Sequence, residues 1–512
     1  MGGKDKGCAV FPRRTAGVLM HISSLPGPYG IGTMGEQARR FADFLRGAGF
    51  AYWQVLPLVQ TDHGDSPYQS VYASSGNPYL IDPAALAAEG LLKKSELAAF
   101  RRPNGGQADY GFLRQNHAAL LRRAYARFDR SDPAFRAFAA DGGMEDYALF
   151  MALREKYGAG FFRWPKPLRR RDPAALAAYR GECAEEIGFW LFVQFTFFKQ
   201  WRALKEYVNG LGIRIVGDIP LYMAYDSADV WANPHLFKLN KDLTRRKVAG
   251  VPPDYFSATG QLWGNPVYDW PRHKAEGYAW WIDRIRRAFD LYDVVRIDHF
   301  RGFDRYFEID AHEETAMNGQ WKKGPGAALF DAARAALGEL SFIAEDLGTL
   351  DEGVHRLLRR TGYPGMKVIQ FAFDGSPQNP YLPANIGVNA VCYTGTHDND
   401  TLVGFLSAMQ DWERNNLHAI LRPLLRAAGI PARLGSDRQT AAALRALALS
   451  TRAQLCVLPV QDILLLGGDA RMNVPSVPEG NWRFRLTRAM PRSAAEACRS
   501  LLQKWGRAGG RA

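Results

Sequence analysis

The residues with the clearest capacity for chemistry lie in residues 294–301, Val-Val-Arg-Ile-Asp-His-Phe-Arg. The β-branched apolar start predicts a buried strand, in which charge appears only at Arg296 and Asp298. Side chains alternate along a strand, so these two would share one face, where the guanidinium can keep the carboxylate ionised and oriented. A nucleophile or an electrostatic stabiliser requires such a carboxylate. The alternative is that Asp298 is an ordinary loop or helix-cap residue.

A carboxylate stands at the end of four predicted strands, namely Asp218, Asp298, Glu345 and Asp398. Carboxylates that share a cleft repel each other, so their pKa values separate, leaving one group protonated and another ionised. Asp298, beside Arg296, is the expected ionised member. Glu345 is longer and has no adjacent arginine, so it is the expected proton carrier. This pair is the equipment of a glycosidase, with retention of configuration at a carboxyl separation of ~5 Å and inversion beyond ~6.5 Å.

Eight predicted strands alternate with helical stretches and must position these side chains. The alternation favours a parallel (β/α)8 TIM barrel over an open sheet, although seven or nine strands also fit, and it places an active site at the C-terminal ends of the strands. The 50 residues after position 462 are too few for a C-terminal β-sandwich domain of ~100 residues. The expected strands lie in residues 17–26 (running into a loop), 52–58, 214–220, 293–300, 341–347, 367–373, 390–396 and 455–462. The clearest helical stretches are residues 34–48, 278–289, 327–337 and 440–453.

A change of composition marks an insertion after the second predicted strand. Residues 84–211 are rich in alanine and arginine, with few β-branched residues, and are expected to form a mainly helical subdomain. Its last helix is predicted over residues 172–207, and its aromatic side chains fit core packing better than a ligand cage. The expected domains are therefore the first part of the barrel in residues 1–83, the insertion in 84–211 and the remainder of the barrel in 212–512.

The composition is that of an ordinary globular enzyme with an arginine-rich surface. The 512 residues carry a formal net charge of +13, but the basic residues are scattered among acidic neighbours, which argues against a nucleic-acid partner. The five cysteines are far apart and form no C-x-x-C pair, which fits reduced thiols in a cytoplasmic location. No signal peptide is visible, and the most apolar stretch, residues 189–198, is about half the length of a membrane span, so no membrane partner is expected.

Metal and cofactor chemistry are not expected. The pairs Asp298-His299 and His397-Asp398 could be ligands, but adjacent strand residues point to opposite faces and no H-E-x-x-H motif is present. The sequence also contains neither a G-x-x-x-x-G-K-[ST] phosphate loop nor a G-x-S-x-G elbow. The oligomeric state is not indicated.

A set of motifs across nearly the whole chain resembles the 4-α-glucanotransferases, also called amylomaltases or disproportionating enzymes, of glycoside hydrolase family 77. The Arg-x-Asp and His-Asp elements are shared with α-amylases in general, whereas the PPDYF and GNW stretches are more specific. The motifs are residues 64–69 (GDSPYQ), 217–222 (GDIPLY), 226–231 (DSADVW), 250–256 (GVPPDYF), 260–266 (GQLWGNP), 296–301 (RIDHFR), 344–348 (AEDLG), 395–399 (GTHDN), 470–473 (ARMN) and 478–482 (PEGNW).

The resemblance implies a role for each matching residue. It implies that Asp298 is the nucleophile, Glu345 the general acid/base, and Asp398 a third carboxylate that binds sugar hydroxyls and stabilises the transition state. It also implies an active-site loop within residues 251–270 that covers the acceptor side of the cleft. Substrate contacts are expected from Ser66, Tyr68, Asp218, Asp254, Tyr255, Phe256, Trp263, Arg296, His299, His397 and Asn473.

The aromatic residues of this loop agree with that expectation on physical grounds. Tyr255, Phe256 and Trp263 offer flat faces for pyranose rings, and a lid that excludes water favours a sugar hydroxyl over hydrolysis of an intermediate. Ordinary packing is the alternative for Tyr255 and Phe256. The sequence departs from the family pattern in residues 60–63 (QTDH in place of a Pro-Thr-Gly-Tyr run), in Ser74-Ser75 and at Ser476.

The expected reaction is transfer of a segment of an α-1,4-glucan to the 4-hydroxyl of an acceptor glucan or glucose, by retaining double displacement through a glycosyl-Asp298 intermediate. An α-glucan hydrolase of the α-amylase type is the first alternative. A glucan-binding barrel without catalytic activity is the second.

Overall fold

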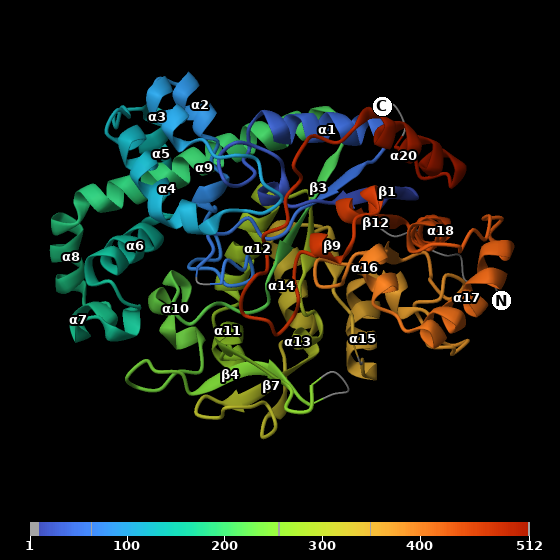
Figure 1. The fold of residues 1–512 in the computed structure, drawn as a ribbon. Helices are drawn as coiled ribbons and strands as arrows, with labels where there is room; N and C mark the ends of the chain where they lie inside the picture. Colours follow the sequence, from blue (N-terminus) through green and yellow to red (C-terminus); the bar gives the residue numbers. More distant parts are fainter. Residues whose placement is uncertain (1–9, 63, 254–256, 349, 510–512) are drawn as a thin grey trace.

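A closed barrel of eight parallel strands forms the centre of the computed structural model, which describes residues 10–62, 64–253, 257–348 and 350–509 (Figure 1). The order of the strands around the barrel is β1-β12-β11-β10-β9-β6-β3-β2. These strands are short apolar runs whose side chains are almost all buried, as strands covered on both faces require. Their bounds are β1 Thr15–Leu19, β2 Tyr52–Gln54, β3 Arg214–Ile219, β6 Val294–Ile297, β9 Phe342–Ala344, β10 Gly365–Val368, β11 Ala390–Tyr393 and β12 Leu455–Pro459.

The prediction of a (β/α)8 TIM barrel is therefore confirmed, and all eight predicted strands overlap the observed ones. Most are shorter than predicted, and β6, β9 and β11 end where polar residues enter loops at Asp298, Glu345 and Thr394. The sixth strand begins two residues early, at Gly365, and the eighth ends at Pro459, after which α19 (Val460–Leu464) begins.

The helical insertion after β2 is also present, and Figure 1 shows it on the left of the barrel. The prediction of one long helix over residues 172–207 is wrong, because the structure has two helices there. They meet at Cys183, whose φ of −100° and ψ of 17° depart from helical values. Asp172 caps α8, as its position before Pro173 favours. The helices are α2 Pro83–Ala88, α3 Lys94–Phe100, α4 Tyr110–Tyr125, α5 Pro133–Ala140, α6 Glu145–Tyr157, α7 Lys166–Arg169, α8 Pro173–Glu182 and α9 Ala184–Gly210.

An antiparallel sheet that the sequence did not predict is built from the loops after β3 and β6. Its strand order is β5-β4-β7-β8, and it lies below the barrel in Figure 1. The central pair joins β4 to β7, with Val248 opposite Ile309. The sheet thus ties the segment that leads to Trp263 to the segment that follows Asp298. The strands are β4 Lys247–Val251, β5 Gln261–Pro266, β7 Arg305–Asp310 and β8 Gln320–Lys323.

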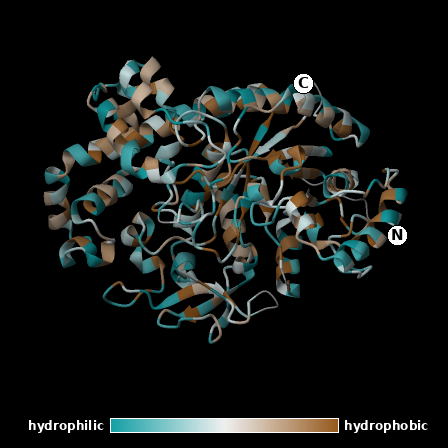
Figure 2. Ribbon diagram, in the orientation of Figure 1, coloured by the Kyte–Doolittle hydropathy of each residue, from teal (hydrophilic) through white to brown (hydrophobic). Residues whose placement is uncertain are grey.

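The remaining helices surround the barrel and the site. Brown, hydrophobic residues are prominent in the central strands, while the outer helices carry both colours (Figure 2), as amphipathic helices around a core should. Helix α20 packs on α1, so the last described helix contacts the first. None of the helices in the described ranges is long and apolar enough to cross a membrane. The helices are α1 Glu36–Ala48, α10 Ala228–Ala232, α11 Trp270–Ala275, α12 Ala279–Leu291, α13 Arg301–Asp304, α14 Ala327–Leu337, α15 Glu352–Thr361, α16 Leu402–Ser407, α17 Asp411–Ala427, α18 Asp437–Ser450 and α20 Arg492–Lys504.

Candidate active site

Arg296, on β6, lies between two carboxylates. The register of β3 and β6 sets Arg296 opposite Asp218, and its Nη1 donates to Oδ2 of Asp218 at 2.6 Å. Its Nη2 lies 3.0 Å from Oδ1 of Asp298, the residue that follows the strand's end. The Arg296 and Asp218 side chains are 4% and 0% exposed, so this pair acts with little screening by water. The contact expected between Arg296 and Asp298 is therefore present.

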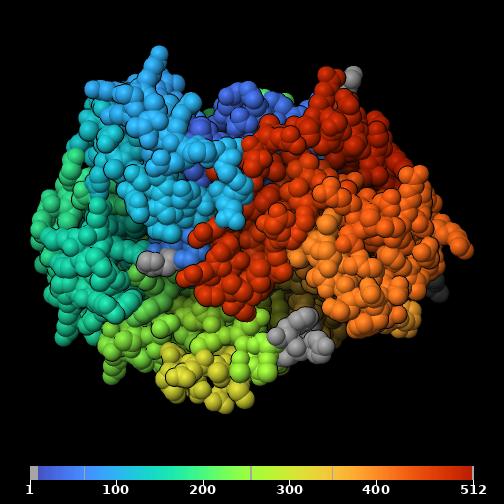
Figure 3. All heavy atoms as spheres, in the orientation of Figure 1, coloured from blue at the N-terminus to red at the C-terminus, as the bar shows by residue number. Residues whose placement is uncertain are grey.

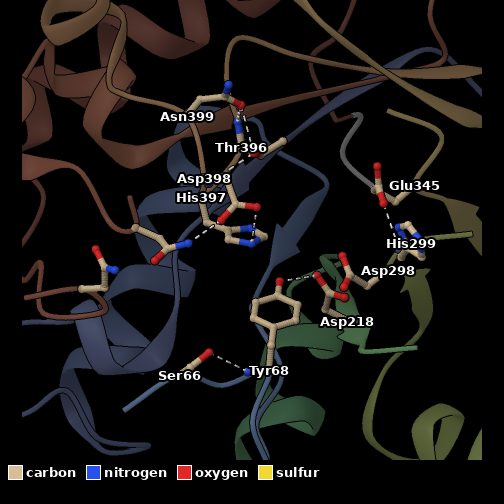
Figure 4. A network of polar contacts seen from close by, with 12 residues as sticks. Ser66, Tyr68, Asp218, Asp298, His299, Glu345, Thr396, His397, Asp398 and Asn399 are labelled. Atoms are coloured by element: carbon tan, nitrogen blue, oxygen red, sulfur yellow. Dashed lines mark hydrogen bonds and ion pairs between the residues drawn. The ribbon is translucent and has the colours of Figure 1, made fainter. Parts of the chain in front are cut away.

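Asp218 is buried below Asp298 and is held from two sides. Besides Arg296, the hydroxyl of Tyr68 donates to Oδ2 of Asp218 at 2.9 Å. Burial raises the pKa of Asp218 to about 7, and the positive charge of Arg296 opposes this rise. Figure 4 shows the Tyr68 hydroxyl pointing at Asp218, with the carboxyl group of Asp298 beside it.

Glu345 follows β9, the strand next to β6, and its carboxyl group is held by backbone. The N–H of His299 donates to Oε2 at 2.8 Å, and the N–H of Leu347 donates to Oε1 at 2.9 Å. Burial raises the pKa of Glu345 to about 7, the negative charge of Asp298 adds to the rise, and Arg296 opposes it. A group with this pKa carries a proton over the acidic to neutral range, as a general acid requires.

His299 directly follows Asp298, and its N–H bonds the carboxyl group of Glu345. Its φ of 49° lies in the left-handed region, which is uncommon for a residue with a side chain and often marks a functional site. Trp263 of β5 meets the imidazole edge-on, with ring centroids 4.9 Å apart. Burial lowers the pKa of His299 to about 4, so the ring is neutral at neutral pH.

Asp398 lies in the loop after β11, across the cleft from Asp298. The amide of Asn473 donates to its Oδ1 at 2.6 Å, and Nε2 of His397 lies 3.3 Å from its Oδ2. The Tyr68 ring stacks on the His397 ring, with centroids 5.0 Å apart and an interplanar angle of 17°. Asp398 is thus oriented by side chains from two separate loops.

An open cleft of about 710 Å³ runs over this set of residues. Asp298 and Asp398 are among its lining residues, and segments 257–263 and 473–482 form parts of its walls. In Figure 3 the red C-terminal segment lies across the middle of this face, beside the light-blue start of the insertion, in agreement with the bridge that joins Gln107 to Phe484. The volume suits several sugar rings better than a single small molecule.

The structure brings together most of the predicted site residues around the cleft. Ser66 lines it and accepts a hydrogen bond at Oγ from the N–H of Tyr68. Three predicted residues, Asp254, Tyr255 and Phe256, lie outside the described residues. The residues placed in or next to the cleft are Ser66, Tyr68, Asp218, Trp263, Arg296, Asp298, His299, Glu345, His397, Asp398 and Asn473.

Sequence reasoning missed several residues that line the cleft. Trp482 packs 5.8 Å from both Tyr68 and His397, with a φ of 65°, and its only sequence signal was the GNW stretch. Leu262, Val474 and Val477 expose apolar side chains there. Within the ranges that the structure describes, no three or more His, Cys, Asp or Glu side chains are grouped so that they could hold a metal ion.

The barrel and the carboxylates at its C-terminal edge define an enzyme of the glycoside hydrolase and transglycosylase class. A family profile described as 4-alpha-glucanotransferase matches residues 20–490. The chain is 47% identical to the 4-alpha-glucanotransferase of Thermus thermophilus, over 92% of this chain and 95% of that protein. It is 45% identical to that of Clostridium butyricum, over 91% and 95%.

The chain therefore belongs to the 4-alpha-glucanotransferase family, glycoside hydrolase family 77, and is an enzyme of the glycosyltransferase type. A solved amylomaltase from Streptococcus agalactiae, in complex with acarbose, superposes with a TM-score of 0.91 at 37% identity, over 97% of this chain and all of that one. An amylomaltase from Corynebacterium glutamicum has the same fold, with a TM-score of 0.80 at 19% identity, over 96% of this chain and 75% of that one.

Proposed function

We propose that this enzyme breaks an α-1,4 bond in a donor glucan, keeps the donor segment on Asp298, and passes it to the 4-hydroxyl of an acceptor glucan or glucose. The observation that carries the proposal is that Asp298 and Glu345 follow neighbouring strands and have different environments. Asp298 faces the cleft with Arg296 at 3.0 Å, while the pKa of Glu345 is raised to about 7. One carboxylate is thus equipped to attack and the other to carry a proton.

The first step forms the glycosyl-enzyme. Oδ2 or Oδ1 of Asp298 attacks the anomeric carbon, and the protonated Glu345 gives its proton to the departing 4-oxygen. Asp398, held by Asn473 at 2.6 Å, is placed to bind sugar hydroxyls as positive charge develops on the ring. The reducing-end fragment then leaves, and Glu345 remains as a carboxylate.

The second step returns the proton. Glu345 takes it from the 4-hydroxyl of the acceptor, whose oxygen attacks the anomeric carbon and displaces Asp298. Two displacements restore the α configuration. Trp263 and the exposed apolar side chains of Leu262, Val474 and Val477 cover the cleft walls, which favours a sugar over water as the acceptor.

The relatives support an α-glucan as the substrate class. Each of the curated relatives above is named a 4-alpha-glucanotransferase, and the amylomaltase from Streptococcus agalactiae binds acarbose. A cytoplasmic location remains part of the proposal, supported by four buried free thiols at Cys183, Cys392, Cys456 and Cys498.

Incubation with maltotriose tests the reaction. Transfer must give both glucose and chains longer than maltotriose, whereas glucose and maltose alone would indicate a hydrolase. A protein that binds maltodextrin but leaves maltotriose unchanged would be a binding barrel.

The intermediate is tested with two variants. Asp298→Asn should lose several orders of magnitude in kcat with maltodextrin binding retained, because the covalent bond cannot form. Glu345→Gln, supplied with an α-glucosyl fluoride, should accumulate a glycosyl adduct on the peptide that contains Asp298. Mass spectrometry that finds the adduct on another residue would remove Asp298 from this role.

A further inference from the structure

The loop that carries Tyr68 into the cleft is fastened at both of its legs to the helical insertion. We call residues 55–62 and 64–77 the β2 loop. Its first leg contains Gln60 and its last leg contains Gly76, and an antiparallel bridge joins Thr61 to Ser70. Tyr68 lies between the legs, at the part of the loop that reaches the cleft.

One tyrosine hydroxyl joins the two legs. Tyr147 of α6 donates to Oε1 of Gln60 on the first leg. The same hydroxyl accepts from Nε2 of Gln194 on α9 at 3.0 Å. Gln194 in turn bonds both backbone groups of Gly76, donating to its C=O at 3.0 Å and accepting from its N–H at 2.6 Å.

The two side chains that the insertion contributes to this network are desolvated, so their geometry is strongly specified. Tyr147 and Gln194 are both 0% exposed, and an unmade hydrogen bond at either would leave a polar group without water. Gly76 lies so close to α9 that an added Cβ would fall 1.9 Å from the ring of Phe197. The last leg therefore has no room to shift toward the helix.

The legs set the place of Tyr68, and Tyr68 connects to the reacting groups. Its hydroxyl bonds Asp218 at 2.9 Å, and Asp218 shares Arg296 with Asp298. Its ring stacks on His397, which neighbours Asp398. A displacement of the loop would therefore reach both sides of the cleft.

We propose that Tyr147 is a positioning residue for the transfer reaction: its hydroxyl locks the two legs of the β2 loop and so holds Tyr68 on Asp218 and His397. Tyr147 is not among the residues that line the cleft, and in this proposal it acts through Tyr68. The proposal rests on the function proposed above and assigns the helical insertion a part in it.

A double-mutant cycle tests the proposal, with initial rates of glucose release from maltotriose as the readout. Tyr147→Phe should lower kcat about five- to twentyfold, with KM changed less than about twofold, because the loss is one of orientation. If Tyr147 acts through Tyr68, the double variant Tyr147→Phe/Tyr68→Ala, which lacks both the hydroxyl and the ring of Tyr68, should be no slower than Tyr68→Ala alone. Losses that multiply would show independent effects and overturn the proposal.

Tyr157→Phe is the matched control. Tyr157 ends the same helix, and its hydroxyl pairs with that of Tyr179 inside the insertion, away from the β2 loop. It should lower Tm with kcat unchanged. A loss of kcat equal to that of Tyr147→Phe would assign the effect to the stability of α6, and the proposal would fail.

Gln60→Met provides a second route if Tyr147→Phe does not fold. It removes the acceptor from the loop side with little change in volume and should reproduce the loss of kcat. Wild-type enzyme without transfer products would refute the proposed function. If the wild-type enzyme transfers normally and Gln60→Met keeps the wild-type kcat, the role of Tyr147 is refuted while the proposed function stands.

Discussion

The backbone N–H of His299 donates a hydrogen bond of 2.8 Å to Oε2 of Glu345. His299 directly follows Asp298, so the turn that presents the proposed nucleophile also holds the proposed proton carrier. Glu345 follows β9, which pairs with β6, so this bond joins the ends of two neighbouring strands. Backbone N–H groups thus hold the carboxyl group of Glu345, while the Arg296 side chain holds that of Asp298.

The pH dependence of kcat/KM should report the ionisation of Glu345. Its pKa is raised to about 7 by burial, and only the protonated form can act as acid in the first step. We expect kcat/KM for maltotriose to fall about tenfold per pH unit above this pKa. In Glu345→Gln the residual activity should lack this alkaline limb, and a limb that persists there would belong to another group.

The raised pKa of Glu345 should also lower the free energy of unfolding at neutral pH. The folded-state pKa of about 7 exceeds the ordinary value of 4.5, so between these values the unfolded chain releases a proton that the folded protein retains. Stability contributed by this group is full below about pH 4.5 and is lost as the pH rises toward 7. We expect Glu345→Gln to raise Tm by ~2–4 °C at about pH 8 and to leave it unchanged at about pH 4. A lower Tm at the higher pH would contradict this reading.

Removal of Asp218 should destabilise the protein, because it leaves Arg296 without its buried partner, while the other partner, Asp298, is 30% exposed. The Arg296 and Asp218 side chains are 4% and 0% exposed. We expect Asp218→Ala to lower the free energy of unfolding by about 3–5 kcal/mol in chemical denaturation. Glu36→Ala is the control, since the pair of Glu36 with Arg40 is 71% and 58% exposed and should contribute less than ~1 kcal/mol.

Asn473 should matter for the transition state more than for the fold. Its amide donates to Asp398 at 2.6 Å across two loops, a charge-assisted bond that orients the carboxylate. We expect Asn473→Ala to lower kcat/KM for maltotriose about 10- to 100-fold, with Tm within about 1 °C of wild type. The control is Asn240→Ala, in an exposed turn, which should leave kcat/KM unchanged. A large drop in Tm with normal kcat/KM would show that Asn473 is structural.

Local sequence patterns were enough to predict most of the barrel strands and the carboxylates at their ends. The run Val294–Ile297 forms a strand because it is short and its apolar residues are β-branched. Arg296 lies opposite Asp218 in the neighbouring strand β3. Asp172 before Pro173 likewise marks a helix start by local chemistry alone.

Features that depend on pairing between distant segments could not be predicted from the sequence. Strands β4 and β7 belong to loops that follow different strands of the barrel, so neither segment signals the pairing by itself. Gln261–Pro266 of β5 contains glycine and proline, which weaken a strand signal. The bond from Tyr147 to Gln60 joins residues 87 apart. No periodicity encodes such a contact, because it arises from how two subdomains pack.

The closure of the barrel has a consequence for synthesis. β1 pairs directly with β12, with Thr15 opposite Leu455. On the ribosome the nascent sheet therefore keeps two open edges until residue 459 has emerged, and an open edge can pair with another chain. Loop 473–482, which contributes to the wall of the cleft, follows still later. Folding of the active enzyme is thus a late event in translation, and shielding of the β1 edge by a chaperone should raise its yield.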